Sequence, residues 1–251
     1  MDISERFWHA SLEELKRGYI EDNNAFVCLL DGKIVEKGIV YPVEGLFYEA
    51  ERYMGVYIEK TYGSVFSYLL RMDKKLTGLT DHQKRLLELF YEGLNDSEIK
   101  EAAGIGSTST IRNHRFALKE KERQAKVFLT IMELLKEKDS GATTFIEPHK
   151  TARMLDDRYN VTEAEREKLL NKYFPDGTDG QLTTFAIKEK AKFVVLREIS
   201  KRFDAGRVYT EKEINEIIKT VYEDYVTIRR YLIDYGFLDR KEDGSAYWLK
   251  A

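Results

Sequence analysis

The stretch "LTDHQKRLLELFYEGLNDSEIKEAAGIGSTSTIRNHRFALKEK", residues 79–121, has the clearest local pattern in the chain. Its apolar residues recur at helical spacing in three groups, which are separated by turn residues. Thr80 is expected to cap the first helix and Gly93 to end it. The pattern therefore predicts three helices, the third at about 110–120. A fourth, longer helix is expected to follow and to end near Gly141.

Hydroxyl, amide and basic side chains gather where the third of these helices begins. In a helix-turn-helix the second helix of the motif lies in the major groove of DNA, with its N-terminal residues at the bases. Arginine pairs with guanine and asparagine with adenine, while hydroxyl groups bind phosphates. The residues predicted to contact double-stranded DNA are Ser107, Thr108, Ser109, Thr110, Arg112, Asn113, Arg115 and Lys119. The alternative is a helical hairpin that belongs to a core and contacts no DNA.

Four pieces of this segment match a known pattern: "LT" at 79–80, "LLELFYEGLNDSEI" at 86–99, "GI" at 104–105 and "STIRNH" at 109–114. With them the segment resembles the LuxR-type helix-turn-helix. The resemblance implies a DNA-binding regulator of transcription. Two departures concern the geometry at the groove: Lys100 stands where the family usually has alanine, and the turn is one residue longer.

The helix expected after the motif carries a wide apolar stripe made of Val127, Phe128, Ile131, Leu134 and Leu135. Such a stripe is unfavourable in water and needs a surface to cover it. It packs either within the chain or against a second copy. A homodimer would present two recognition helices to an operator with two-fold symmetry.

Residues 184–251 predict three helices followed by a β-hairpin, which is the element order of a winged helix. Thr210 is expected to cap the second of these helices in a capping box with Glu213. Four stretches of this region are distinctive in sequence: "KEKAKFVVLREISKRF", "GRVYTEKEIN", "EDYVTIRRYLIDYGFLDR" and "DGSAYW". On these stretches the chain resembles the bacterial domain of unknown function 2087, over nearly all of 165–249.

Two basic residues on the third helix of this domain, Arg229 and Arg230, have two interpretations. In the first interpretation, they contact DNA phosphates as part of a second DNA-binding helix. Alternatively, one of them pairs inside the domain, because charged side chains on a helix are commonly ion-paired. The partners expected in that case are Asp224, Asp234 or Glu223.

The stretch "FVCLLDGKIVEKGIVY", residues 26–41, contains the only cysteine and predicts two short strands around the turn "DGK". Together with "YMGVYIEKTYGS" it resembles a small module of related regulators, which begins "C-L-L-C-G" and closes "H-x-x-x-x-H-G-S". That pattern implies four zinc ligands. Here the four positions hold Cys28, Asp31, Tyr57 and Tyr62. Because tyrosine is rarely a zinc ligand, we expect a degenerate zinc-finger-like module without metal, filled by packed side chains.

Length and composition set the class of the whole chain. Its 251 residues are 43% hydrophobic and 34% charged, which predicts a mainly α protein with small β-hairpins (α+β). Helical spacing adds helices at 4–18, 44–60 and 162–173. The expected segments are the zinc-finger-like module at 1–78, the helix-turn-helix with its long helix at 79–140, a bridge at 141–183 and the winged-helix-like domain at 184–251. No apolar run approaches ~20 residues, so no membrane contact is expected, and a single cysteine suits the cytoplasm.

The sequence predicts no catalytic residue, metal site or cofactor, because its histidines are scattered and it has no Gly-rich phosphate pattern. The predicted function is a sequence-specific DNA-binding transcriptional regulator of a bacterium or its prophage. The alternative is a protein-interaction adaptor that uses the same folds without reading DNA. A peptide, protein or small-molecule effector would bind the bridge at 142–183 or the N-terminal module.

Overall fold

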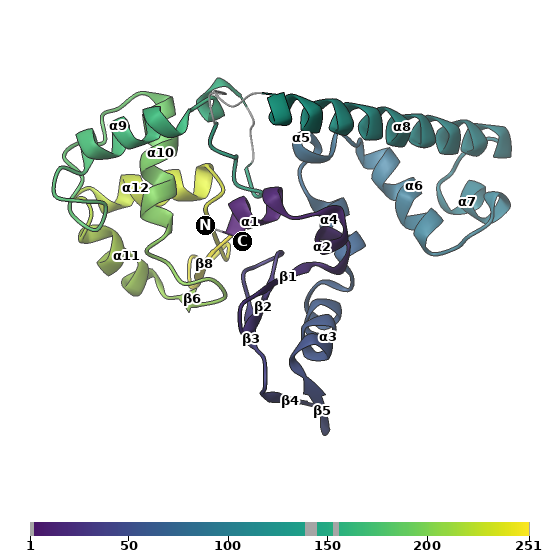
Figure 1. The fold of residues 1–251 in the computed structure, drawn as a ribbon, viewed down its shortest axis with the longest axis horizontal. Helices are drawn as coiled ribbons and strands as arrows, with labels where there is room; N and C mark the ends of the chain where they lie inside the picture. Colours follow the sequence, from purple (N-terminus) through teal and green to yellow (C-terminus); the bar gives the residue numbers. More distant parts are fainter. Residues whose placement is uncertain (1–2, 139–144, 153–155, 251) are drawn as a thin grey trace. The chain divides into compact units, whose positions relative to one another are not determined.

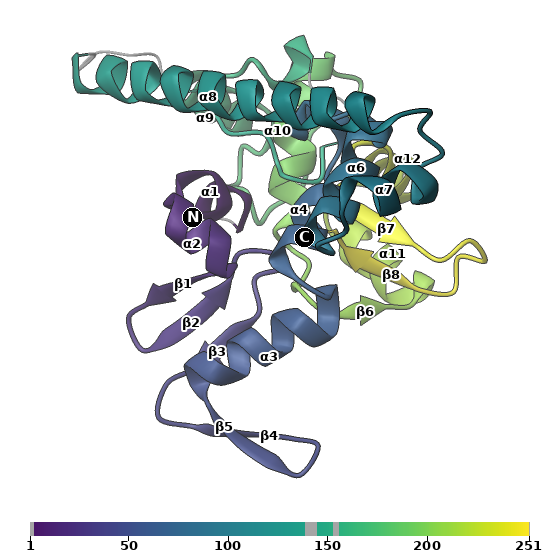
Figure 2. The same ribbon diagram turned by 90° about the vertical axis from the view of Figure 1, so that its right-hand side faces the viewer.

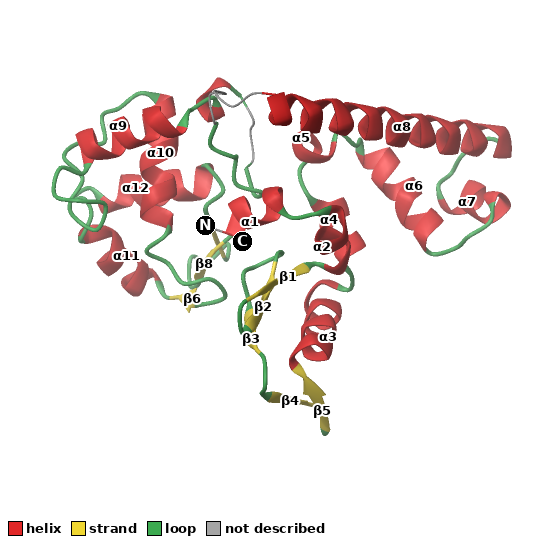
Figure 3. Ribbon diagram, in the orientation of Figure 1, coloured by secondary structure: helices red, strands yellow, loops and turns green. Residues whose placement is uncertain are grey.

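The computed structural model describes residues 3–138, 145–152 and 156–250 (Figure 1). The chain folds into two compact units, and the second, Thr77–Thr144, is inserted between the two segments of the first, Met1–Leu76 and Phe145–Ala251. Helices dominate, and the sheets are small and antiparallel (Figure 3). The N-terminal module and the C-terminal domain thus share one unit. Within the described ranges, no helix has both the length and the apolar character that crossing a membrane requires.

The N-terminal part of the first unit is a three-stranded sheet covered by a helix. Its elements are α1 (Ile3–His9), α2 (Leu12–Arg17), β1 (Tyr19–Asp22), β2 (Ala25–Cys28), β3 (Ile34–Glu36), β4 (Val40–Val43), β5 (Leu46–Glu49), α3 (Ala50–Tyr62), α4 (Val65–Arg71) and α5 (Lys74–Thr77). The sheet has the order β1-β2-β3, and its β2–β3 hairpin confirms the strands expected around "DGK". A core of Phe26, Cys28, Val35 and Met54 joins this sheet to α3.

Two expected helices in this part are wrong in extent. The helix expected at 4–18 is broken, because Ser11 starts a new helix through a capping box with Glu14. The helix expected from residue 44 begins only at α3, because Glu44 and Gly45 have positive φ angles and turn β4 back onto β5. The β4–β5 hairpin extends from the end of α3, away from the three-stranded sheet (Figure 2).

The C-terminal part of the first unit packs its helices on a second small sheet. Its elements are the 3₁₀ helix η1 (Asp157–Tyr159), α9 (Glu163–Tyr173), α10 (Glu189–Ser200), β6 (Val208–Tyr209), α11 (Glu211–Lys219), α12 (Tyr225–Asp234), β7 (Leu238–Arg240) and β8 (Tyr247–Leu249). The strands pair antiparallel in the order β6-β8-β7. α10 is the central helix, and most of its side chains are buried. The capping box of Thr210 with Glu213 and the final hairpin are confirmed.

The second unit consists of α6 (Asp81–Tyr91), α7 (Asp96–Ala102) and α8 (Thr108–Lys138), around a core of Leu86, Leu89, Ile99 and Ile111. Thr80 caps α6 as expected. The expected division into a third and a fourth helix is wrong, since α8 is one continuous helix of 31 residues. Its sequence has no glycine or proline and is rich in lysine, glutamate and leucine, which have high helix propensity.

Candidate functional site

The start of α8 presents two residues that were predicted to read DNA bases. Ile111 is fully buried in the core of the second unit, and this fixes the rotation of the helix about its axis. With Ile111 inward, Arg112 and Asn113 are exposed. About three quarters of the Arg112 side chain (75%) is accessible, and its Nε lies 3.7 Å from an oxygen of Asp96. Arg112 therefore has room to reach a DNA base.

The four predicted hydroxyl residues form the cap and the first turn of α8. Ser107 Oγ accepts a hydrogen bond from the backbone N–H of Thr110 at 3.2 Å, which satisfies one of the free donors of the helix end. The same oxygen lies 2.8 Å from Ser109 Oγ and 3.0 Å from Thr110 Oγ1. Thr108 is the first helical residue. The hydroxyls are thus grouped at a helix N-terminus, where a phosphate would be favoured.

The other two predicted residues of this helix differ in their surroundings. The Nε of Arg115 lies 3.1 Å from an Asp96 oxygen, and its guanidinium lies 3.8 Å from the centre of the Phe90 ring. Arg115 therefore joins α8 to α7 and α6. Lys119 is exposed and pairs with Glu122 at 2.7 Å. DNA contact by Arg115 stays a prediction, and it would compete with these internal contacts.

The four positions that were compared with zinc ligands meet in the N-terminal module. The Tyr62 hydroxyl donates to Asp31 Oδ2 at 2.7 Å, and the Tyr57 hydroxyl donates to the same oxygen. Cys28 is fully buried. Instead of packing on each other, the two tyrosines share one carboxylate. Among the described residues, no group of three or more His, Cys, Asp or Glu side chains is placed to hold a metal ion.

Burial keeps the thiol and the two phenol groups of this cluster protonated. Loss of solvent, followed by the charge of Asp31, raises the pKa of Cys28 to about 12. Burial and the hydrogen bond to Asp31 raise the pKa of Tyr57 and of Tyr62 well above the usual value for tyrosine. At neutral pH the cluster therefore holds one thiol, two phenol hydroxyls and a carboxyl group that accepts from both. A thiol with this pKa is a poor nucleophile and a poor metal ligand.

Arg229 and Arg230, both on α12, have different environments. The Arg229 guanidinium donates to Glu211 at 2.7 Å and to Asn215, and only 15% of the side chain is exposed. Its carboxylate partner lies on α11 and is not one of the three that the sequence suggested, Asp224, Asp234 and Glu223. Arg230 is exposed. DNA contact by Arg229 stays a prediction that requires these bonds to open.

The C-terminal domain is the part of the chain that matches a known family. Residues 181–249, which include every element from α10 to β8, match the family described as an uncharacterized protein conserved in bacteria (DUF2087). The chain contains a DUF2087 domain. The match begins after α9 and is therefore shorter than the region from 165 over which the sequence resembles this family. Neither the curated proteins nor the solved structures include a match to this chain.

A joint between the DUF2087 domain and the N-terminal module was not expected from the sequence. It is the segment "EPHKT", residues 147–151, which we call the clamp segment. Its first, third and fifth residues bond to the DUF2087 domain, and its second and fourth to the N-terminal module. On the domain side, the bonds join Glu147 O to Arg197 (2.9 Å), His149 Nε2 to Tyr235 O (2.9 Å) and Thr151 Oγ1 to Gly236 O (2.9 Å).

On the side of the N-terminal module, the main contact of the clamp segment is a buried ammonium group. Lys150 Nζ donates to the carbonyls of Leu29 and Leu30, at 2.6 and 2.5 Å, in the loop that follows Cys28. The side chain is buried, and such a charge is stable only where acceptors replace its water. Trp8 Nε1 also donates to the carbonyl of Pro148 at 2.7 Å. No sequence pattern marks this role, since it depends on segments about 120 residues apart.

Proposed function

We propose that the chain is a sequence-specific DNA-binding transcriptional regulator of a bacterium or its prophage, in which the start of α8 reads the DNA. The observation that carries this proposal is the exposure of Arg112 and Asn113 on a helix whose rotation is fixed by the buried Ile111. α7 and α8 follow each other after a short turn, as the two helices of a helix-turn-helix do.

The charge along α8 supports the same assignment. From Arg112 to Lys126 the helix carries six basic and two acidic side chains, while the whole chain has a net charge of −3. Lys119 and Arg123 pair with Glu122 and Glu120 within the helix, and both basic side chains are largely exposed. Because exposed pairs of this kind contribute little, DNA phosphates can compete for both cations.

The DUF2087 domain is the second candidate for DNA contact. Its element order, with a sheet of order β6-β8-β7, is that of a winged helix, and α12 would be its recognition helix. However, Arg229 is engaged by Glu211, and exposed carboxylates flank the exposed Arg230 at Glu223, Asp224 and Asp234. We therefore assign base reading to the second unit alone.

The second half of α8 supports a homodimer. Phe128, Leu129 and Leu134 expose 64%, 59% and 56% of their surface, and a helix with apolar residues on this many sides needs a covering partner. A second copy would supply that cover and a second recognition helix. The same surface favours the alternative function, an adaptor that binds another protein. DNA selection separates the two functions.

The N-terminal module supports a proposal of its own. We infer a zinc-finger-like fold in which hydrogen bonds to Asp31 occupy the place of the metal, because the four ligand positions converge there. Mass-spectrometric metal analysis of the purified protein is expected to find no stoichiometric zinc. One zinc ion per chain would contradict the proposal.

The decisive test of DNA reading is selection from random double-stranded DNA with the purified full-length protein. We expect the bound fragments to share a sequence, and their affinity to fall steeply with salt. Arg112→Ala and Asn113→Ala should each cost about 1–3 kcal/mol and relax the preference at one base position. Gln124→Ala, an exposed neutral residue on the same helix, is the matched control. If the selected pool stays random, the regulator is excluded and the adaptor is favoured.

A further inference from the structure

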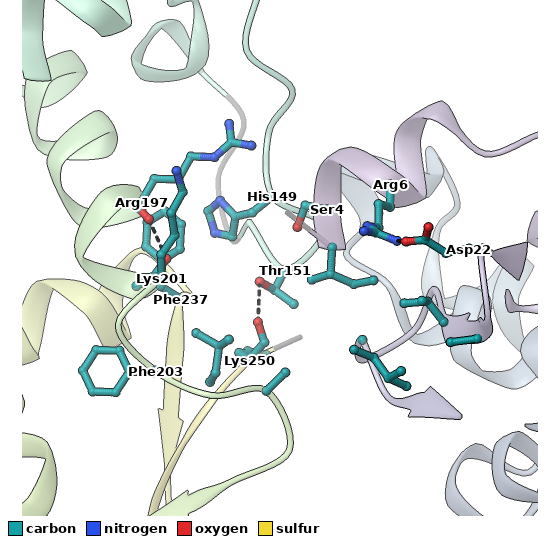
Figure 4. A pocket seen from close by; sticks show the side chains of 18 residues that line it. Ser4, Arg6, Asp22, His149, Thr151, Arg197, Lys201, Phe203, Phe237 and Lys250 are labelled. Carbon is teal, nitrogen blue, oxygen red and sulfur yellow. Dashed lines mark hydrogen bonds and ion pairs between the residues drawn. The ribbon is translucent and has the colours of Figure 1, made fainter. Parts of the chain in front are cut away.

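A cavity of about 360 Å³ lies inside the first unit, where the N-terminal module meets the DUF2087 domain (Figure 4). α1, β1 and β2 form one wall, and α10 with the loop after it forms the other. His149 and Thr151 of the clamp segment lie between the two walls. A cavity of this size is in the range of pockets that hold small molecules.

Most of the surface of this cavity is apolar. Phe203 and Phe237 are almost completely buried and contribute to the wall on the side of the DUF2087 domain. Val27 and Ile34 line the opposite wall, and the exposed Ile34 extends the apolar surface toward solvent. The imidazole of His149 is stacked on Phe237, with 4.1 Å between ring centres. A ligand here would gain free energy by burying an apolar body against these side chains.

The residues that line the cavity include more basic than acidic side chains. Its lining includes four basic side chains but a single carboxylate, Asp22, which pairs with Arg6 at 2.6 Å. The other three basic residues are Arg197, Lys201 and Lys250. Their carboxylate partners, Glu5, Glu198 and Asp239, do not line the cavity. This arrangement favours an anionic group on the ligand.

We propose that this cavity binds a small carboxylic acid with an apolar body. Both halves of the unit form the site, because the residues that line it come from the N-terminal module and from the DUF2087 domain. A bound acid therefore stabilises the joint between the N-terminal module and the DUF2087 domain. The proposal does not depend on DNA binding.

Octanoate is the probe for a first test, by calorimetric titration into the full-length protein. Octylamine has a tail of similar length with the opposite charge, and acetate has the carboxylate with almost no apolar body. We expect octanoate to bind and to raise the melting temperature, while the other two bind at least about tenfold more weakly. Equal affinity for octylamine, or no binding of octanoate at millimolar concentration, would overturn the proposal.

Two variants with matched controls locate the binding. Lys201→Gln should weaken octanoate binding about fivefold, as expected for an exposed charge. Lys192→Gln should leave it unchanged, because Lys192 pairs with a glutamate three residues earlier, as Lys201 does, but lies outside the cavity.

The second variant fills the cavity. Ala205→Phe places a ring in it and should reduce affinity at least about tenfold, whereas Ala186→Phe, at an exposed position elsewhere, should not. Thermal melting of both phenylalanine variants checks that they are folded. If either control variant loses as much affinity as its partner, octanoate binds elsewhere and the proposal fails.

Discussion

At the scale of single residues, Asp31 organises the core of the N-terminal module. Its carboxylate accepts the hydroxyls of Tyr57 and Tyr62, and it also accepts the backbone N–H of Lys33 at 2.9 Å. One side chain thus joins the loop after β2 to two positions in the C-terminal half of α3. These bonds help to hold the loop against the helix.

Removing this carboxylate should destabilise the first unit. Asp31→Ala leaves two half-buried hydroxyls without their acceptor, so we expect a loss of about 1–3 kcal/mol in the free energy of unfolding. Tyr62→Phe removes a single bond and should cost about 1 kcal/mol. Tyr48→Phe, on the β4–β5 hairpin, serves as the control and should cost less. Urea denaturation gives all of these values, and Asp31→Ala within error of the wild type would contradict the prediction.

Cys28 should make the stability of the first unit decrease at alkaline pH. The folded thiol has a pKa of about 12, and its ordinary value is 9.0. Between these values the unfolded chain loses the proton while the folded chain keeps it, so deprotonation favours unfolding. The stabilisation is complete below about pH 9 and is lost as pH rises toward 12. Urea denaturation from pH 8 to 11 tests this, and Cys28→Ala should flatten the decrease, since it removes the titrating thiol.

At the scale of elements, α8 carries two proposed functions along one helix. Its first turns carry the predicted DNA contacts, and its second half carries the exposed apolar residues. Two lysines on it have similar exposure and similar ion pairs. Lys119 and Lys136 both pair with a glutamate three residues away, at 2.7 and 2.8 Å, and are 68% and 70% exposed.

A comparison of alanine variants at these two lysines distinguishes a phosphate contact from a general effect of charge on DNA binding. Lys119→Ala should weaken DNA binding for all sequences and reduce the dependence of log affinity on log salt by about one unit, because one phosphate contact is lost. Lys136→Ala changes the net charge equally and should leave that slope unchanged. Fluorescence anisotropy over a range of salt concentrations gives both slopes. An equal effect of the two variants would place the DNA elsewhere than at the start of α8.

At the scale of the whole molecule, the clamp segment connects the two parts of the first unit. It bonds alternately to the N-terminal module and to the DUF2087 domain, which are separate in sequence. The second unit enters the chain just before the clamp segment, with a small core of its own. We expect two thermal transitions, one for each unit.

Lys150 tests the clamp segment directly. Lys150→Met keeps most of the side-chain volume and removes the ammonium group. The Leu29 carbonyl then loses this donor, and the Leu30 carbonyl keeps the hydroxyl of Tyr68, so we expect a cost of about 1–3 kcal/mol. Hydrogen exchange should then show the loop 29–33 opening before the rest of the first unit. Lys168→Met, at an exposed position on α9, is the control. Unchanged protection of this loop in Lys150→Met would show that the clamp segment does not hold it.

Local signals in the sequence were sufficient for most of the elements. The caps at Thr80 and Thr210, the turn "DGK" and the final hairpin depend on neighbouring residues, so they can be predicted without knowing the fold. The incorrect predictions of helix boundaries also have local causes. The helix at 44–60 was predicted too long because the β4–β5 hairpin has apolar residues that suit either structure, and no breaker separates the third and fourth helices of the second unit.

What the sequence determined by itself is therefore most of the elements, the DUF2087 domain and the candidate residues at the start of α8. The tertiary structure decided which side chains are held by contacts inside the protein. It placed Arg229 against Glu211, Arg115 against Phe90, and Lys150 against the loop after Cys28. The physical reason is that caps and turns depend on residues a few positions apart, whereas a buried charge or a cavity depends on segments that only folding brings together.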